Sequence, residues 1–145
     1  LLGGERPNTP ETRNGAFVIP TVFEVYDNRM ELMQEEIFAP VVGIMRVKDG
    51  QEAAELTNDS RYGLCASVWT MDYRKGILLT EQLNVGTAWL NQHLAIVSET
   101  PWGGRKESGW TKENSILVLD EYTYHKHVWI NMAETPNTFW ADRIK

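Results

Sequence analysis

Two carboxylates stand directly before a run of apolar residues in the stretch QEEIFAPVV, residues 34–42. Glu36 and Phe38 lie two positions apart, and side chains two apart on an extended chain point to the same side. Together they would present a hydrogen-bond acceptor and an aromatic face, which suits a ribose beside a flat ring. The alternative is that Glu35 and Glu36 are solvated or cap a backbone turn, and this alternative needs no ligand.

The other side chains of reactive type have few partners close to them in the sequence. Cys65 lies inside the apolar run LCASVW with no neighbouring His or Lys to lower its pKa, so we expect a buried, inert thiol. His125 and His127 would share one face of a strand. Two such ligands without a nearby carboxylate or thiol make a weak metal site, so we expect packed or solvated imidazoles. For His93, in the loop NQHLAIVSET, a pocket position and a surface position are equally open. The residues themselves predict no metal site and no catalytic group.

The composition of the 145 residues limits the classes of partner. A formal net charge of -6 argues against a general nucleic-acid or acidic-membrane binder. We find no apolar stretch long enough to span a bilayer, and the first ten residues lack the basic start and apolar core of a signal peptide. A single cysteine excludes an internal disulfide, which fits a cytoplasmic protein. The absence of an initiator Met favours a section of a longer chain.

The elements that would position these residues follow an α/β pattern, because apolar runs bounded by turn residues alternate with segments of helical period. Asp49 and Asp72 are expected N-caps, and Glu52 would complete a capping box with Asp49. The order of strands and helices predicts parallel pairing with right-handed crossovers. We expect extended segments at 16–25, 39–47, 64–70, 87–91 and 124–131, and helices at 50–59, 73–83 and 111–122.

Segment 124–131, YHKHVWIN, follows the last helix and has no later partner strand. It would either form an edge that pairs with another chain or complete the chain's own sheet. The pattern of residues leaves both alternatives open.

Five motifs, in order, resemble segments of the NAD(P)-dependent aldehyde dehydrogenases. GAFVIPTVF is similar to the family's G-x-F-x-x-P-T-V-F, and QEEIFAPVV resembles its E-E-I-F-G-P-V. The other three are NDSRYGLCASVWT, VGTAWLN and PWGGRKESGW. Together they cover about residues 3–131. The resemblance implies the C-terminal part of such an enzyme: 1–121 as a partial three-layer catalytic domain with a mainly parallel sheet, 122–131 as an oligomerisation strand, and 132–145 as a tail.

Roles carry over from the family only where single positions match. Glu36 matches the glutamate that accepts hydrogen bonds from the nicotinamide ribose, and Phe38 matches the aromatic residue beside the nicotinamide. Segment 92–102 matches the wall of the aldehyde tunnel, which makes candidate substrate contacts of His93, Leu94, Ile96 and Trp102. The resemblance therefore implies NAD or NADP as cofactor and an aldehyde as substrate in the complete enzyme, and a homo-oligomer formed through the C-terminal strand.

The family's catalytic cysteine and general-base glutamate lie upstream of the matched section, so the resemblance implies no catalytic residue here. Cys65 stands where the family usually carries Ala or Gly. Departures from the family pattern occur at Ala39, Trp102, Thr111, Lys112 and Ser115, and the bulk of Trp102 would narrow the tunnel. A second hypothesis is an inactive, truncated paralogue that binds another subunit through its edge strand.

Overall fold

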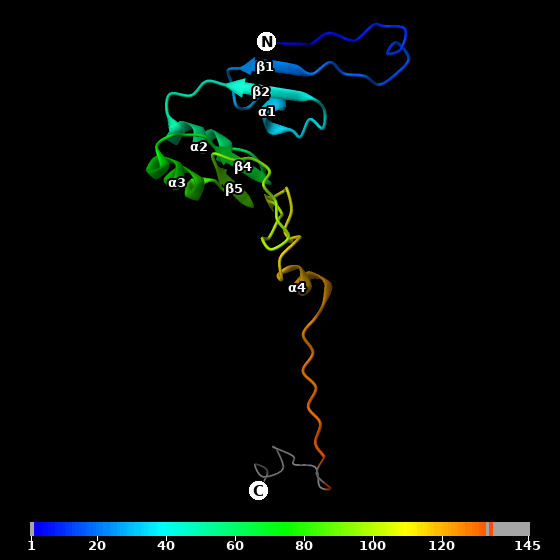
Figure 1. Ribbon diagram of the computed structural model, residues 1–145, viewed down its shortest axis with the longest axis vertical. Coiled ribbons are helices and arrows are strands. Elements are labelled where there is room, and N and C mark those ends of the chain that lie inside the picture. Colours follow the sequence, from blue (N-terminus) through cyan, green and yellow to red (C-terminus); the bar gives the residue numbers. More distant parts are fainter. Residues whose placement is uncertain (1, 133, 135–145) are drawn as a thin grey trace.

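The computed structural model describes residues 2–132 and 134 of the chain. Figure 1 shows a folded body built from short strands and helices, with a long C-terminal segment running away from it. The elements in chain order are β1 (Thr21–Val25), α1 (Glu31–Gln34), β2 (Val41–Met45), α2 (Gly50–Asn58), β3 (Tyr62–Gly63), β4 (Cys65–Val68), α3 (Tyr73–Gln82), β5 (Thr87–Leu90), β6 (Arg105–Lys106) and α4 (Val118–Tyr122).

The strands of the described residues form three separate pairs, of which two are parallel. β1 pairs with β2 in parallel, with Thr21 beside Val41. β4 pairs with β5 in parallel, with Ser67 beside Trp89, and β3 pairs with β6 in the antiparallel sense. The predicted α/β class with mainly parallel pairing is confirmed. The sequence did not assign partners to the strands, and β2 takes β1 as its neighbour.

Both predicted N-caps are present. The Asp49 carboxylate accepts a hydrogen bond from the backbone N–H of Glu52 at 2.9 Å, and the Glu52 carboxylate accepts in return from the N–H of Lys48 at 2.6 Å. The Asp72 carboxylate accepts from the N–H of Lys75 at 3.1 Å. Helices α2 and α3 therefore begin where the sequence predicts, since these side chains satisfy N–H groups that the first turn leaves open.

Several predicted elements are shorter than expected, and for three of them the reason is local. The strand expected at 16–25 begins only at Thr21, directly after Pro20, which lacks the N–H that a ladder needs. The strand expected at 64–70 is reduced to Cys65–Val68, and Leu64 lies between β3 and β4, where the Gly86 N–H is shared between the carbonyls of Gly63 and Leu64. The helix expected at 111–122 is reduced to α4, since Asn114 and Ser115 have φ of 60° and 54°.

Much of the apolar surface of the chain stays open to solvent. Helix α3 lies against the pair of strands β4 and β5 and also packs on α2. The two helices cover one side of this strand pair (Figure 1). Among the described residues, Val25 and Ala54 are the buried apolar side chains. The accessible surface is 12427 Å², against roughly 7,600 Å² for a compact monomer of the same mass. A second apolar layer is therefore needed to bury the remaining surface.

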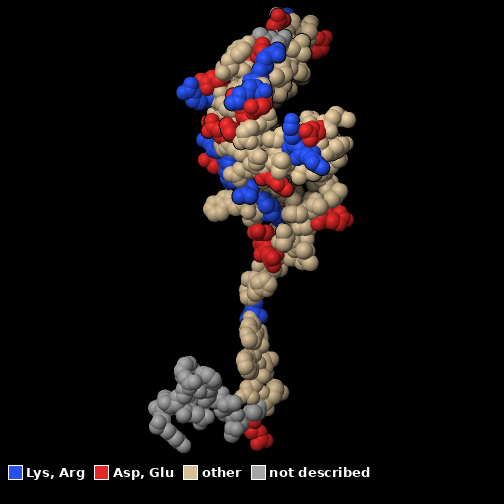
Figure 2. Space-filling model, turned by 90° about the vertical axis from the view of Figure 1, so that its left-hand side faces the viewer, with Lys and Arg blue, Asp and Glu red and all other residues tan. Residues whose placement is uncertain are grey.

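The segment after α4 runs away from the folded body (Figure 1). Its large apolar side chains are exposed to solvent. The strand predicted at 124–131 does not form within the described part of the chain, so it does not complete the chain's own sheet. Figure 2 shows acidic and basic residues intermixed over the body, whereas this segment is mostly uncharged. Apart from Met132 and Glu134, the predicted tail at 132–145 lies outside the described residues. Within the described residues, none of the helices has the length and apolar character that crossing a membrane requires.

Candidate cofactor and substrate site

Glu36 lines a hollow of about 440 Å³ between the end of α2, strand β3 and the turn that follows β6. Tyr62, Cys65 and Ser108 line the same hollow. Among the described residues the Glu36 carboxylate has no hydrogen-bonding partner, so both of its oxygens can accept from a ligand hydroxyl. Phe38 is 97% exposed and does not line the hollow. Glu36 and Phe38, which the sequence analysis places on one side of the chain, thus lie on the same exposed segment, and Glu36 lies at the edge of the hollow.

The segment that carries Glu36 leaves helix α1 in an extended conformation. Glu35 closes the helix by donating its N–H to the carbonyl of Glu31 at 2.8 Å, and its own φ of -108° and ψ of 148° are extended. At the other end of the segment, the Pro40 carbonyl accepts from the N–H of Thr21 at 2.9 Å, which joins it to β1. The backbone is therefore fixed at both ends of 35–40, and the residues between them are exposed.

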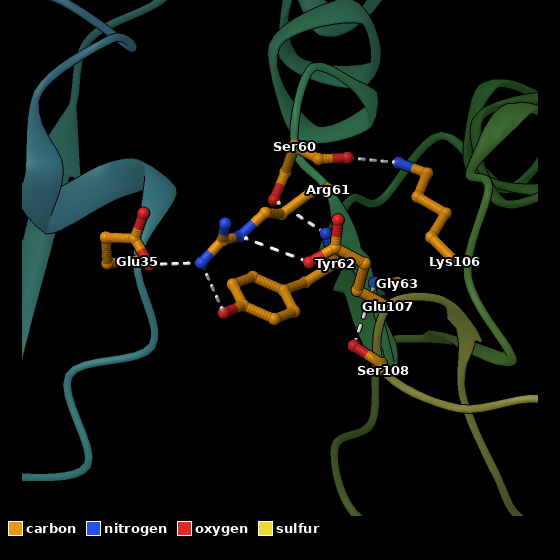
Figure 3. A network of polar contacts seen from close by, with 8 residues as sticks. All are labelled: Glu35, Ser60, Arg61, Tyr62, Gly63, Lys106, Glu107 and Ser108. Atoms are coloured by element: carbon orange, nitrogen blue, oxygen red, sulfur yellow. Dashed lines mark hydrogen bonds and ion pairs between the residues drawn. The ribbon is translucent and has the colours of Figure 1, made fainter.

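A network of charged and hydroxyl groups crosses one wall of the hollow (Figure 3). The Arg61 guanidinium donates to the Glu35 carboxylate at 2.5 Å and to the Tyr62 hydroxyl at 3.1 Å, and lies 3.4 Å from the Glu107 carboxylate. The pKa of Arg61 is raised, first by the hydrogen bond to Tyr62 and then by the charge of Glu35. Arg61 thus connects the α1 side of the molecule to the turn after β6.

The corner that carries Arg61 is fastened to β6. The Lys106 ammonium donates to the carbonyls of Asn58 and Ser60, both at 2.8 Å, so a cation sits at the negative end of helix α2. The Ser108 hydroxyl accepts from the N–H of Gly63 at 3.0 Å. These bonds satisfy carbonyls at the helix end and hold the wall of the hollow together.

Cys65 is only partly buried, so the sequence overstated its burial. Burial nevertheless raises the pKa of the Cys65 thiol, which keeps it protonated at neutral pH. A thiol in that state is a poor nucleophile, as the sequence predicts.

The candidate substrate residues separate into two groups. His93 and Trp102 come together around Trp89 of β5: the Trp89 ring lies 5.6 Å from His93, edge-on, and 5.9 Å from Trp102. Leu94 and Ile96 instead point to solvent, and Leu94 has a φ of 53°. The structure therefore builds an aromatic cluster from His93 and Trp102 but brings neither Leu94 nor Ile96 to it.

Two members of this cluster were missed from the sequence. The Ser67 hydroxyl lies 2.7 Å from Nδ1 of His93, and the Trp89 indole N–H donates to the carbonyl of Ala95 at 3.1 Å. Both residues sit in strands, and their cross-strand register brings them side by side. Finding them would have required the register of the β4–β5 pair, and the spacing of the motifs does not determine that register.

The two C-terminal histidines lie away from the hollow. His125 is 3.7 Å from the Asp120 carboxylate, and the ring of His127 stacks on that of Trp129 at 6.0 Å. In the described part of the chain, no three His, Cys, Asp or Glu side chains gather closely enough to hold a metal ion.

The comparisons with known proteins agree on one family. The sequence profile described as the aldehyde dehydrogenase family matches residues 1–128. Betaine aldehyde dehydrogenase of Bacillus subtilis is 40% identical over 129 residues, which is 89% of this chain and 26% of that protein. Apo betaine aldehyde dehydrogenase of Staphylococcus aureus, a G234S mutant, matches with a TM-score of 0.81 and 38% identity over 88% of this chain and 25% of its own.

A second solved structure, a Mycobacterium tuberculosis aldehyde dehydrogenase complexed with NAD+, matches with a TM-score of 0.80 and 40% identity. The match covers 94% of this chain and 28% of that one. The chain therefore spans about a quarter of the length of the relatives it matches.

Proposed function

Since the chain belongs to the aldehyde dehydrogenase family, we propose that it forms the C-terminal section of an NAD(P)-dependent enzyme that oxidises an aldehyde to a carboxylic acid. The observation that carries this proposal is the family match over residues 1–128, with Glu36 at the edge of the hollow. The relative of known structure that holds NAD+ supports the choice of cofactor. The complete enzyme's activity is thus proposed from a section of it.

In this proposal the section positions the cofactor and shapes the substrate site. NAD(P)+, when bound, accepts a hydride from the aldehyde carbon. The unpartnered Glu36 carboxylate fits the hydroxyls of a nicotinamide ribose, and the exposed ring of Phe38 would lie beside the nicotinamide. The nucleophile and the general base would come from outside these residues.

The aromatic cluster supports a cationic aldehyde as substrate. The rings of Trp89 and Trp102 attract a quaternary ammonium group through their π-faces. Two of the three named relatives are betaine aldehyde dehydrogenases, and betaine aldehyde carries such a group. We infer that Trp89, His93 and Trp102 form part of a site for that end of the substrate.

The expected result in the complete enzyme is aldehyde-dependent NAD(P)H formation that favours betaine aldehyde over its neutral analogue, in which carbon replaces nitrogen. A cation–π contact predicts a preference of roughly two- to thirtyfold in kcat/KM. The two substrates have the same shape, so the ratio isolates the charge. Trp102→Leu should lower this ratio while leaving the neutral substrate's kcat/KM nearly unchanged. A ratio of one in the unmodified enzyme, or an unchanged ratio in Trp102→Leu, would contradict the substrate class.

We further propose that the segment 122–131 pairs with a second copy of the chain, and that the enzyme is cytoplasmic. Exposed Val128, Trp129 and Ile130 support the pairing, because a segment with unpaired backbone groups and large exposed side chains can form a strand against another chain. The single cysteine is in keeping with a reducing compartment.

Removing residues 123–145 from the complete enzyme should reduce its mass in solution, as measured by light scattering. Val128→Asp should do the same with one side chain, because an interface would have to bury the new carboxylate. Glu121→Gln, at the end of α4, serves as a control that leaves the segment intact. An assembly of unchanged size in both altered proteins would exclude this strand as the contact.

A further inference from the structure

The segment that carries Glu36 has little to hold its side chains in place. Residues 35–40 are exposed. Among the described residues, one side-chain hydrogen bond ties this segment to the rest of the molecule, and it joins Glu35 to Arg61 at 2.5 Å. The position of Glu36 therefore depends on its two backbone ends and on this single ion pair.

Arg61, the partner of Glu35 in this ion pair, is itself held in place by other contacts. Its carbonyl accepts from the N–H of Glu107 at 3.0 Å, and its side chain also contacts the Tyr62 hydroxyl and the Glu107 carboxylate. The adjoining corner is held by the ammonium of Lys106. In Figure 3 the Arg61 side chain reaches from this corner across to Glu35 on the neighbouring segment.

The ion pair itself adds little to the free energy of unfolding. The Arg61 and Glu35 side chains are 47% and 43% exposed, and ion pairs between exposed groups contribute little because water and salt screen them. Its effect should therefore appear in the position of the neighbouring residue rather than in the stability of the fold.

We propose that Arg61 is a positioning residue that holds Glu36 at the edge of the hollow by way of Glu35. The inference rests on the proposed function, because it requires Glu36 to contact the nicotinamide ribose. A guanidinium is suited to this task, since its planar fork can hold Glu35 and Tyr62 at one end and face Glu107 at the other. A lysine ammonium carries its three donors on one nitrogen, so it cannot hold Glu35 and Tyr62 at one end while it faces Glu107 at the other.

The chain offers a matched control in the pair of Arg29 and Asp27. Their side chains lie 2.8 Å apart, but the two residues are neighbours in one turn, so the pair connects no separate segments. Arg29→Met removes an exposed arginine and an ion pair, as Arg61→Met does, without releasing the Glu36 segment.

The test compares Arg61→Met, Glu35→Gln and the double variant in the complete enzyme, with Arg29→Met as control. The rate of hydride transfer in a single turnover should fall about fivefold or more in Arg61→Met and in Glu35→Gln, since small misplacements of a reacting group slow a reaction strongly. The double variant should be no slower than either single one, because both changes remove the same contact. The thermal midpoint should stay near that of the unmodified enzyme in all four proteins.

Glu36→Gln serves as the reference that separates the proposed ribose contact of Glu36 from the proposed positioning role of Arg61. If Glu36→Gln is slow and both Arg61→Met and Glu35→Gln transfer hydride at the unmodified rate, the positioning role is wrong and the ribose contact stands. If Glu36→Gln is itself unaffected, the ribose contact fails and the role of Arg61 fails with it. An equal slowing of Arg29→Met, or losses that add in the double variant, would also overturn the positioning role. Glu35→Gln keeps the test decisive if Arg61→Met does not fold.

Discussion

A purified chain of these 145 residues should form no NAD(P)H from any aldehyde. Oxidation by this family's route needs a thiolate that attacks the aldehyde carbon and a carboxylate that activates water. The one thiol in the sequence, Cys65, has a pKa raised by burial and so stays protonated at neutral pH. Glu36 alone offers the cofactor one carboxylate, without a glycine-rich turn for its phosphates. The expected rate is therefore indistinguishable from the uncatalysed reaction.

The measurement is the absorbance of reduced nicotinamide in the presence of betaine aldehyde, its neutral analogue and a simple alkanal. Cys65→Ser provides the matched control, because it removes the only sulfur nucleophile and changes little else. Calorimetric titration with NAD+ and NADP+ should show no heat of binding. Robust activity that Cys65→Ser abolishes would show that Cys65 is a nucleophile. It would also contradict the proposal that the nucleophile and the general base come from outside these residues.

In the complete enzyme, Glu36→Gln should lower kcat by about ten- to hundredfold. A hydrogen bond to a charged group contributes roughly 1.5–3 kcal/mol, and each 1.36 kcal/mol in a barrier is about tenfold in rate. The amide keeps one acceptor oxygen but loses the negative charge that the ribose hydroxyls would meet. Because a displaced nicotinamide ring cannot take the hydride, the loss should appear in turnover more than in KM for the aldehyde.

Single-turnover and steady-state rates, together with the Kd of the cofactor, check this result. Glu31→Gln in the first turn of α1 is the control, since it neutralises a nearby exposed carboxylate that does not line the hollow. Unchanged turnover and cofactor affinity in Glu36→Gln would return Glu35 and Glu36 to a capping or solvated role.

The sequence predicted best those elements whose causes lie within a few residues. Asp49 and Asp72 mark helix starts because each side chain bonds an N–H three residues ahead, a distance that the sequence displays directly. The starts of α2 and α3 follow from this. The short pair of β3 and β6 was missed, because Tyr62 and Lys106 are distant in the sequence and neither segment has a strand pattern of its own.

The errors arose where backbone conformation or a distant contact decided the outcome. No residue type in TKENSI forbids a helix, yet Asn114 and Ser115 adopt left-handed angles while Glu113 pairs with Trp102 in a bridge. The choice of β1 as the partner of β2 depends on which strands are available in the sheet, and the order of elements along the chain does not determine this.

The candidate site shows the same division. Glu36 was found from its neighbours and from a motif, whereas Arg61 stood inside another motif, NDSRYGL, and had no assigned role. Its contact with Glu35 spans 26 positions, so only the folded chain brings them together. Trp89 was likewise read as part of a strand, and its ring contacts with His93 and Trp102 are tertiary.

The open apolar surface of the chain also determines how it would respond to heat and denaturant. The heat-capacity increment of unfolding and the slope of stability against denaturant both grow with the surface that unfolding newly exposes. An unfolded chain of this mass exposes roughly 24,000 Å², so with 12427 Å² already accessible when folded the isolated section newly exposes roughly 11,600 Å², against roughly 16,400 Å² for a compact monomer. Its melting would therefore be broader and less cooperative than that of a compact domain of the same mass. If these residues unfold in a sharp thermal transition in the complete enzyme, the difference from the isolated section measures how strongly the rest of the protein stabilises them.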